Sequence, residues 1–439
     1  MSAGEQLAAP TCPYAPTDFG RLYELEPELV RCPFPLYDVL RDREPVWFDA
    51  RLDAYVVTRY ADVMEILRDP LTFSSAMASG PTSITGLAQR IVDDPARPER
   101  LRNQAARRLR MAETPVLLLA DPPQHKRQRA LVASAFSPRR IAALEPEVRE
   151  LAATMIDGFA ARGEVELVRE FALPLPMTVI ATMLGVPPSD LADFKRWANA
   201  FTAGVGSADK PAAEVAQMFA DIDAFYDYFT EQIARRRARG QDDLLTDLVH
   251  ARMDGVEPLT DDEILLMLAQ FLVGGHETTT LMITSMMHRF ATEPYLAARV
   301  RREPELLPAL LEEMLRLEAP VQGMFRSATR ATRIGDVDVP AGALLWLVFG
   351  SANRDPEAFP DPDFLSSEAR RTPHLTFGRF EHFCLGSSVA RLELRVAGEL
   401  LLDRLREIRL ACEPHELERH RSFVLHGYPE LPLRFTAAP

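Results

Sequence analysis

One cysteine, Cys384, lies at a position where its sulfur could act as a nucleophile or as a metal ligand. Cys384 follows a loop that contains glycine and aromatic residues, and it precedes a run whose apolar spacing predicts a helix. Backbone amides and the dipole at the start of a helix favour a thiolate, which is both a nucleophile and a metal ligand. The alternative is a buried, inert cysteine. The sequence holds neither a GxSxG nucleophile elbow nor an HExxH zinc motif, so it does not indicate hydrolase chemistry of those kinds.

The residues around this cysteine resemble a known loop. Residues 377–386 read FGRFEHFCLG, which resembles the haem-binding loop of the cytochrome P450 family, FGxGxHxCxG. The resemblance implies that Cys384 is the axial ligand of the haem iron, with Gly386 in the cofactor loop and His382 beside a propionate. One position departs from the pattern, because Phe380 stands where the family has its second glycine. A bulky residue is strained there if the backbone needs a positive φ.

A second motif falls in a long helical pattern. Residues 272–280 read LVGGHETTT, which resembles the family's central-helix motif of an acid followed by an alcohol. The resemblance implies that Glu277 and Thr278 deliver protons to bound dioxygen. It also implies a helix interrupted near Gly274 and Gly275, where small residues let oxygen and substrate approach the backbone.

A third motif places opposite charges one helical turn apart. EEMLR supplies Glu313 and Arg316 at a spacing that lets a carboxylate and a guanidinium pair. Together with Arg354 of ANRDP, they resemble the family's structural Glu-Arg-Arg triad.

A fourth motif is basic. DPPQHKRQR places His125 and Arg129 on one face of a helix, which matches the family's HxxxR motif that meets the haem propionates, and Arg326 is implied as a further propionate partner. Each of these residues alone could be an ordinary surface cation. The four motifs and Arg326 make five matches in the family's chain order, and together they identify the chain as a member of that family.

Membership implies a haem-thiolate monooxygenase with haem b (iron protoporphyrin IX). Such an enzyme uses O2 to hydroxylate or epoxidise a mainly apolar small molecule, and the cofactor carries the hard chemistry. The sequence has no GxGxxG-type dinucleotide segment, so we expect electrons from a separate ferredoxin or flavodoxin with its reductase. Two alternatives stay open at this point: a peroxide-driven haem-thiolate hydroxylase, and a haem-based gas sensor or carrier.

The resemblance also implies where the substrate pocket and the docking surface for the electron donor lie. The substrate pocket is expected to take residues from 74–118, 201–218, 272–278 and 321–325, including Gly274, Val321, Gln322 and Met324, with the amide of Gln322 either binding substrate or facing the backbone. A basic patch for an acidic electron donor is expected on the cysteine side of the haem. Its residues would be Lys126, Arg127, Arg139, Arg140, Arg379 and Arg391.

The elements that must position these residues are mainly helical. Apolar spacing predicts helices over 124–136, 139–161, 174–184, 190–201, 212–238, 242–253, 261–290 and 304–316. Short strands are expected around VWF, AYVVTRY and ATRIGDVDVPAGALLWLVFG, and near the C-terminus. The predicted fold is therefore mainly α with a small β region, one large α-rich unit over residues 1–439 in which a long central helix crosses the haem. Residues 1–20 are expected to be poorly ordered.

Two stretches fit neither pattern. Residues 74–118 are expected to form a long connection carrying a cluster of arginines, which would either bind an anion or face solvent. The arginines are Arg97, Arg100, Arg102, Arg107, Arg108 and Arg110. Residues 353–373 are expected to be irregular as well.

Composition narrows the function classes. The 439 residues are 47% hydrophobic and 26% charged, with a net charge of −14, which suits a globular protein and argues against nucleic acid or an anionic membrane as partner. The 4 cysteines are too few for a disulfide framework. No stretch is long and apolar enough to span a bilayer, and the start of the sequence lacks a signal-peptide pattern. The expected location is the cytoplasm.

Overall fold

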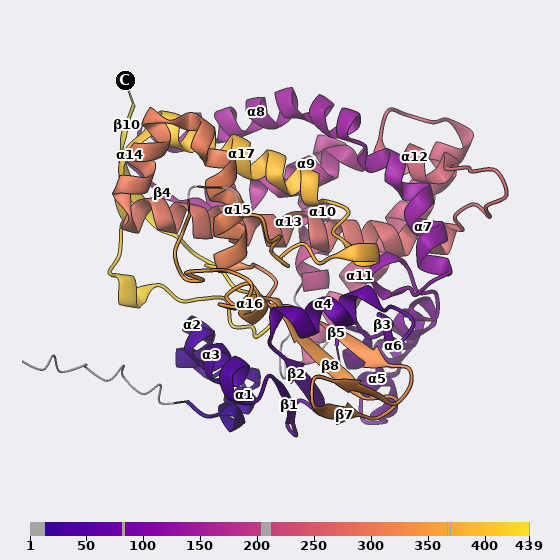
Figure 1. Ribbon diagram of the computed structural model, residues 1–439. Helices are drawn as coiled ribbons and strands as arrows, with labels where there is room; N and C mark the ends of the chain where they lie inside the picture. The colour runs from indigo at the N-terminus through magenta and orange to yellow at the C-terminus, as the bar shows by residue number, and fades with distance from the viewer. Residues whose placement is uncertain (1–13, 81–83, 203–211, 367, 369, 439) are drawn as a thin grey trace, which may run out of the picture.

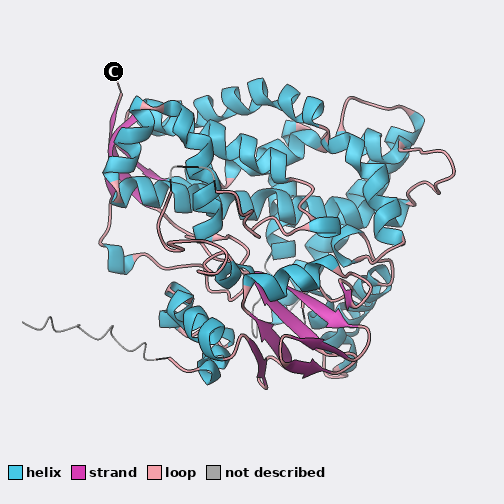
Figure 2. Cartoon of the chain, viewed as in Figure 1, coloured by secondary structure: helices cyan, strands magenta, loops and turns pink. Residues whose placement is uncertain are grey.

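Helices form most of the structure, and strands gather in a few small sheets (Figures 1 and 2). The computed structural model describes residues 14–80, 84–202, 212–366, 368 and 370–438. The helices are α1 (Phe19–Tyr23), α2 (Pro27–Arg31), α3 (Phe34–Arg43), α4 (Tyr60–Arg68), α5 (Ile84–Asp93), α6 (Glu99–Ala112), α7 (Gln124–Val132), α8 (Pro138–Ala160), α9 (Pro174–Met183), α10 (Leu191–Thr202), α11 (Ala212–Ala238), α12 (Leu244–His250), α13 (Asp261–Thr292), α14 (Pro294–Arg302), α15 (Leu307–Glu318), α16 (Phe349–Ala352) and α17 (Ser387–Arg404). The strands are β1 (Val46–Asp49), β2 (Ala54–Val57), β3 (Phe73–Ser74), β4 (Glu164–Glu166), β5 (Gly323–Ala328), β6 (Thr332–Ile334), β7 (Val337–Val339), β8 (Leu344–Val348), β9 (Leu405–Leu410) and β10 (Pro432–Ala437).

The central helix is α13. It starts with a reciprocal cap, in which the Thr260 side chain accepts from the backbone of Glu263 and the Glu263 carboxylate accepts from the backbone of Thr260. The expected interruption at Gly274 and Gly275 is wrong, because α13 is helical without a break from Asp261 to Thr292. Gly275 instead allows close packing, since a Cβ there would lie 3.2 Å from Cγ1 of Ile180. Gly274 faces open space, where a Cβ would meet nothing within 4 Å.

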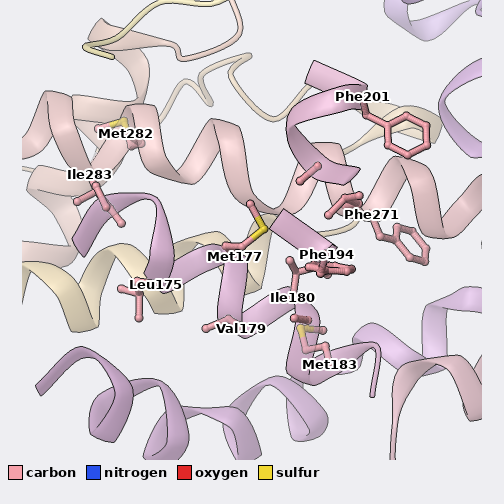
Figure 3. Packing of buried hydrophobic residues seen from close by; sticks show 14 of the residues in the cluster. Leu175, Met177, Val179, Ile180, Met183, Phe194, Phe201, Phe271, Met282 and Ile283 are labelled. Carbon is pink, nitrogen blue, oxygen red and sulfur yellow. The ribbon is translucent and has the colours of Figure 1, made fainter. Parts of the chain in front are cut away.

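Apolar side chains from several helices bury α13. Figure 3 shows α9 lying against it, with Met177 and Ile180 directed toward the central helix. The labelled side chains of this packing are Leu175, Met177, Val179, Ile180 and Met183 from α9, Phe194 and Phe201 from α10, and Phe271, Met282 and Ile283 from α13, all buried. Helices α15 and α17 also pack on α13. The helix is therefore held on several sides, and the residues along it have fixed positions.

The main sheet joins distant parts of the chain. Its strand order is β1-β2-β8-β5-β3, with β2 and β8 parallel and the other pairs antiparallel. A second sheet has the order β4-β10-β9, and β6 pairs with β7. The strands expected from VWF, AYVVTRY and the late segment are all present. The expected small β region, built largely from both ends of the chain, is confirmed.

Two expectations, one about secondary structure in residues 74–118 and one about disorder in residues 1–20, are wrong. Residues 84–93 and 99–112, which were expected to lie in a long connection, form α5 and α6. Residues 14–20 have a defined structure, since Phe19 begins α1 and is fully buried, whereas residues 1–13 lie outside the described part. The irregular stretch is confirmed, because residues 354–366 contain no regular helix or strand.

The arginine cluster on α6 is partly neutralised by acids. Arg107 forms ion pairs with Asp223 at 3.1 Å and with Asp227 at 3.0 Å, both on α11. Arg97 pairs with Asp94 at 3.1 Å. The Arg97 pair is local and precedes α6, whereas the two pairs of Arg107 tie α6 to α11. Arg107 therefore has a packing role rather than a free anion-binding one.

Candidate functional site

Cys384 lies at the entrance to α17. Its backbone N–H donates to the carbonyl of Phe377 at 2.8 Å, which closes the loop before the helix. Burial raises the pKa of the Cys384 thiol, and the backbone amides of Gly386 and Ser387, which donate toward the sulfur, act in the opposite direction. Burial therefore outweighs the helix start, and a bound metal ion is what would deprotonate this sulfur. The expected loop-before-helix setting is present.

The loop contains the strained position that the sequence indicated. Phe380 has a φ of +55°, and Gly378 has a φ of +64°. A left-handed backbone is unfavourable for a residue with a Cβ. The ring of Phe380 is 38% exposed, with the guanidinium of Arg68 over it at 5.2 Å from the centroid. Phe380 thus keeps the glycine-like backbone, and its ring gains contacts at the surface with the guanidinium groups of Arg68 and, at 6.0 Å from the centroid, of Arg379.

Four cationic or cation-forming side chains meet beside this loop. The rings of His125 and His382 lie 4.1 Å apart between centroids, and Nε2 of His382 is 3.0 Å from the hydroxyl of Ser75. Burial, followed by Arg326, His125 and Arg129, lowers the pKa of His382 to about 3. Burial also lowers the pKa of Arg326 to about 10. The structure therefore brings together all four side chains that the sequence assigned to the propionates.

This cluster has the chemistry that an acidic cofactor requires. Nδ1 of His125 is buried without a hydrogen-bond partner, and neither Arg129 nor Arg326 forms an ion pair within the described residues. The nearby carboxylate of Asp121 is engaged elsewhere, accepting from the backbone of Ser75 at 2.7 Å. A buried guanidinium such as that of Arg326, and a buried polar atom such as Nδ1 of His125, are normally paired. Two carboxylates of a haem would supply the partners, and Cys384 would supply the ligand, so the residues fit haem.

On α13, an acid and an alcohol stand side by side. The hydroxyl of Thr278 donates to the carbonyl of Gly274 at 3.0 Å. Burial raises the pKa of Glu277 to about 7. A carboxyl with that pKa can hold and release a proton near neutral pH. A cation-forming group, His420, lies close to this acid, with 3.7 Å between its Nε2 and Oε1 of Glu277, and no sequence motif pointed to it.

The structural ion-pair network differs from the expected triad. Arg316 meets Glu313 through two contacts of 3.0 Å, and the second arginine on Glu313 is Arg370, at 2.7 Å. The prediction that Arg354 is the third member of the triad is wrong. Its guanidinium pairs with Asp363, donates to the carbonyl of Leu317 at 3.0 Å and lies over the ring of Phe34 at 3.8 Å.

The expected pocket residues divide into two groups. Val321 and Met324 are partly exposed, as is the open side of Gly274. Gln322 is buried and donates to the carbonyls of Ala319 at 2.7 Å and Glu318 at 3.3 Å. The alternative in which Gln322 faces the backbone is therefore the observed one. Residues 203–211 of the expected pocket segment 201–218 lie outside the described residues.

Most of the expected basic patch is paired within the chain. Arg391 binds Glu312 at 2.6 Å and lies over Phe377 at 4.5 Å. Arg127 pairs with Glu263, Arg140 with Asp242 and Asp247 at 3.2 Å, and Lys126 with Glu381 at 3.0 Å. Within the described residues, Arg139 and Arg379 form no ion pair. The patch is thus smaller than the sequence suggested.

A loop cysteine at a helix start, beside a cluster of two histidines and two arginines and with a long helix carrying an acid and an alcohol, defines a haem-thiolate protein. Comparison with known proteins agrees. The family model described as Cytochrome P450 matches residues 91–430, and the chain belongs to the cytochrome P450 family. It is therefore a monooxygenase that binds haem b, uses O2 and a small-molecule substrate, and takes electrons from a separate redox partner.

Relatives cover nearly the whole chain. Cytochrome P450 107B1 of Saccharopolyspora erythraea is 38% identical over 87% of this chain and 89% of its own length. The mycinamicin IV hydroxylase/epoxidase of Micromonospora griseorubida is 35% identical over 90% of this chain and 94% of its own. The solved structure of cytochrome P450 CYP109Q5 from Chondromyces apiculatus is 34% identical and has a TM-score of 0.81, covering 94% of this chain and 98% of that one. The predicted fold is confirmed.

Proposed function

We propose that Cys384 is the axial ligand of the haem iron and that His125, Arg129, Arg326 and His382 bind the two propionates. The observation that carries this proposal is the cluster of two histidines and two arginines beside the cysteine loop. Within the described residues, Arg129 and Arg326 form no ion pair, and Nδ1 of His125 is buried without a hydrogen-bond partner. When bound, the haem supplies the oxygen chemistry, and electron density from a thiolate ligand favours O–O cleavage.

The test of the ligand is spectroscopic. The reduced protein under carbon monoxide should show the strongly red-shifted Soret band of a thiolate-ligated haem. Cys384→His should lose that band. Cys412→Ser is the matched control, because Cys412 is a partly exposed cysteine that follows β9 and lies outside the cysteine loop, and it should keep the band. Retention of the band in Cys384→His would overturn the assignment.

We infer that Glu277 and Thr278 handle protons for the reaction. Glu277 lies on α13 with a carboxyl whose pKa burial raises to about 7, so it holds its proton in a large fraction of molecules at neutral pH. Thr278 keeps its hydroxyl next to the open side of Gly274, through the 3.0 Å bond to that carbonyl. The carboxyl stores the proton, and the hydroxyl orients a hydrogen bond toward the pocket.

Removal of the Thr278 hydroxyl separates oxygen activation from cofactor binding. Thr278→Ala should still bind haem and substrate and consume NAD(P)H through the redox partners, but product per NAD(P)H should fall while peroxide is released. Glu277→Gln should slow turnover, since a general acid contributes roughly 10²–10⁴-fold. Unchanged coupling in Thr278→Ala would contradict the assignment.

The substrate surface that we propose includes Gly274, Val321 and Met324. These residues present backbone and apolar side chains, which suit a mainly apolar small molecule. The relative from Micromonospora griseorubida is named for both hydroxylation and epoxidation, and either reaction fits these residues. A spectral screen of apolar compounds for haem spin-state shifts should find ligands, and Met324→Glu should weaken their binding.

We propose further that the chain works as one domain in the cytoplasm, with its electron donor docking near Arg139 and Arg379. The single unit is supported by the pairing of β2 with β8. The described cysteines are free, which suits a reducing compartment. No helix in the described ranges is long and apolar enough to cross a membrane. Cell fractionation, with the protein detected by antibody, would test the location.

A further inference from the structure

The C-terminal loop, residues 411–431, brings an imidazole to the acid of the central helix. Nε2 of His420 lies 3.7 Å from Oε1 of Glu277. This separation is slightly longer than a direct hydrogen bond, and a small side-chain rotation or one bridging water closes it. The side chains are 31% and 16% exposed, respectively, so both groups are largely removed from bulk solvent.

The backbone around His420 is fixed to α13. The N–H of His420 donates to the carbonyl of Gly427 at 3.0 Å. Gly427 lies directly on Leu281, one helical turn after Glu277, because a Cβ on this glycine would come within 2.8 Å of the Leu281 side chain. The loop therefore cannot move away from Glu277 without losing its contact with the helix.

The other side of the loop is fixed to the strand that leads into the pocket. The N–H of Gln322 donates to the carbonyl of Val424 at 2.7 Å, and the N–H of His426 donates to that of Pro320 at 3.0 Å. Val321 and Leu425 form a β-bridge. These contacts hold His420 in place from two directions, which argues that its position beside Glu277 is built into the fold.

In the part of the chain that the structure describes, neither Glu277 nor His420 forms an ion pair with any other group. Burial alone shifts both groups, raising the pKa of Glu277 and lowering that of His420. The neighbouring charged and titratable groups interact with one another instead: Arg289 and His288 of α13, Glu318 of α15, and Arg419, His426 and Tyr428 of the loop. Arg419, although adjacent in sequence, binds Glu318 at 3.5 Å and lies over Tyr428 at 4.0 Å.

We propose that His420 is a positioning residue for Glu277, holding its carboxyl group toward the pocket side of α13 and exchanging one proton with it. The proton moves between Oε1 of Glu277 and Nε2 of His420, so the pair is either an acid with a neutral imidazole or a carboxylate with an imidazolium. This inference rests on the proposed role of Glu277. It adds that the C-terminal loop determines how the Glu277 carboxyl group is oriented and how it regains its proton.

The direct test follows the His420 ring in the complete holoenzyme. In protein labelled with ¹⁵N-histidine and held as the diamagnetic ferrous carbon monoxide complex, His420→Asn identifies the His420 signals among the 9 histidines. A carboxylate at this distance favours the imidazolium, so Glu277→Gln should lower the titration midpoint of His420 by about 1 pH unit or more. An unchanged midpoint would overturn the proposal, whatever the activity of the variants.

Kinetics provide the second readout. His420→Asn should keep the carbon monoxide Soret band, slow turnover and change its pH profile, and it should add little to Glu277→Gln because both act through one carboxyl. His415→Asn is the matched control, since His415 is an exposed histidine of the same loop, and it should behave as wild type. If Glu277→Gln has no effect, the relay itself fails. If Glu277→Gln slows turnover and His420→Asn does not, only the role of His420 fails.

Discussion

Phe380 offers a sharp test of how the cysteine loop is built. Its backbone is left-handed, with φ at +55°, which costs a residue other than glycine roughly 1–2 kcal/mol. Phe380→Gly removes that cost but gives the unfolded chain more freedom, worth about 0.5–1 kcal/mol. It also removes the ring under Arg68, a contact worth about 0.5–1 kcal/mol at an exposed site. The glycine variant should therefore match the wild type within about 1 kcal/mol.

The matched control is Phe380→Ala. Alanine keeps the Cβ and therefore the strain, yet it loses the ring, so it should be less stable than the wild type by about 0.5–1 kcal/mol and less stable than the glycine variant. The assay is denaturant unfolding of the holoenzyme, followed by the Soret band and by far-ultraviolet circular dichroism. A more stable alanine variant would refute the reasoning. Loss of haem in both variants would show that the ring, not the backbone, holds the loop.

Three further outcomes are expected. Arg370→Ala should destabilise the protein by about 3 kcal/mol because it leaves the buried carboxylate of Glu313 with one partner fewer. Arg354→Ala should cost less, since the acidic partner of Arg354, Asp363, is exposed. Equal unfolding midpoints for the two variants would contradict this. Burial raises the pKa of Glu393 to about 8 from 4.5, so its contribution to stability is full below about pH 4.5 and is lost as the pH rises through 8. The stability of the wild type relative to Glu393→Gln should thus fall between pH 5 and pH 8 in parallel denaturation curves, and a flat difference would disprove it. Arg379→Glu should slow reduction by an acidic ferredoxin in stopped-flow measurements, and salt should slow the wild type, since exposed charges are screened over about 8 Å at physiological ionic strength; rates indifferent to both would remove Arg379 from the docking site.

The sequence was most informative where chemistry depends on a local motif. The loop before Cys384 and the histidine and arginine of α7 could be recognised because both motifs lie within one turn or loop, where spacing determines geometry. The long helix α13 was predictable from its apolar pattern and its Thr260 cap. The backbone at Phe380 could be anticipated as well, since the pattern has a glycine at that position.

The errors arose where partners are distant in sequence. Arg370 and Arg354 both precede the cysteine loop, and only the packing of the irregular stretch decides which one reaches Glu313. Helix α6 was missed because its many arginines hide a narrow apolar side, and its ion pairs are with α11. His420 lies 143 positions after Glu277 in the sequence numbering, and no spacing rule connects a loop histidine to a helix that far away.

The parallel pairing of β2 with β8 has a consequence for how the protein is made in the cell. Residues 54–57 must wait for residues 344–347 before their sheet can form. Translation at about 5–20 residues per second needs roughly 15–60 s to cover that interval. During this time the N-terminal strands have an unpaired edge, which is prone to wrong pairing. Arg326 is synthesised shortly before β8, on the strand that pairs with it, and Cys384 is synthesised after β8. Haem uptake therefore belongs to the end of synthesis, and haem supply at that moment would govern how much nascent chain reaches its final form.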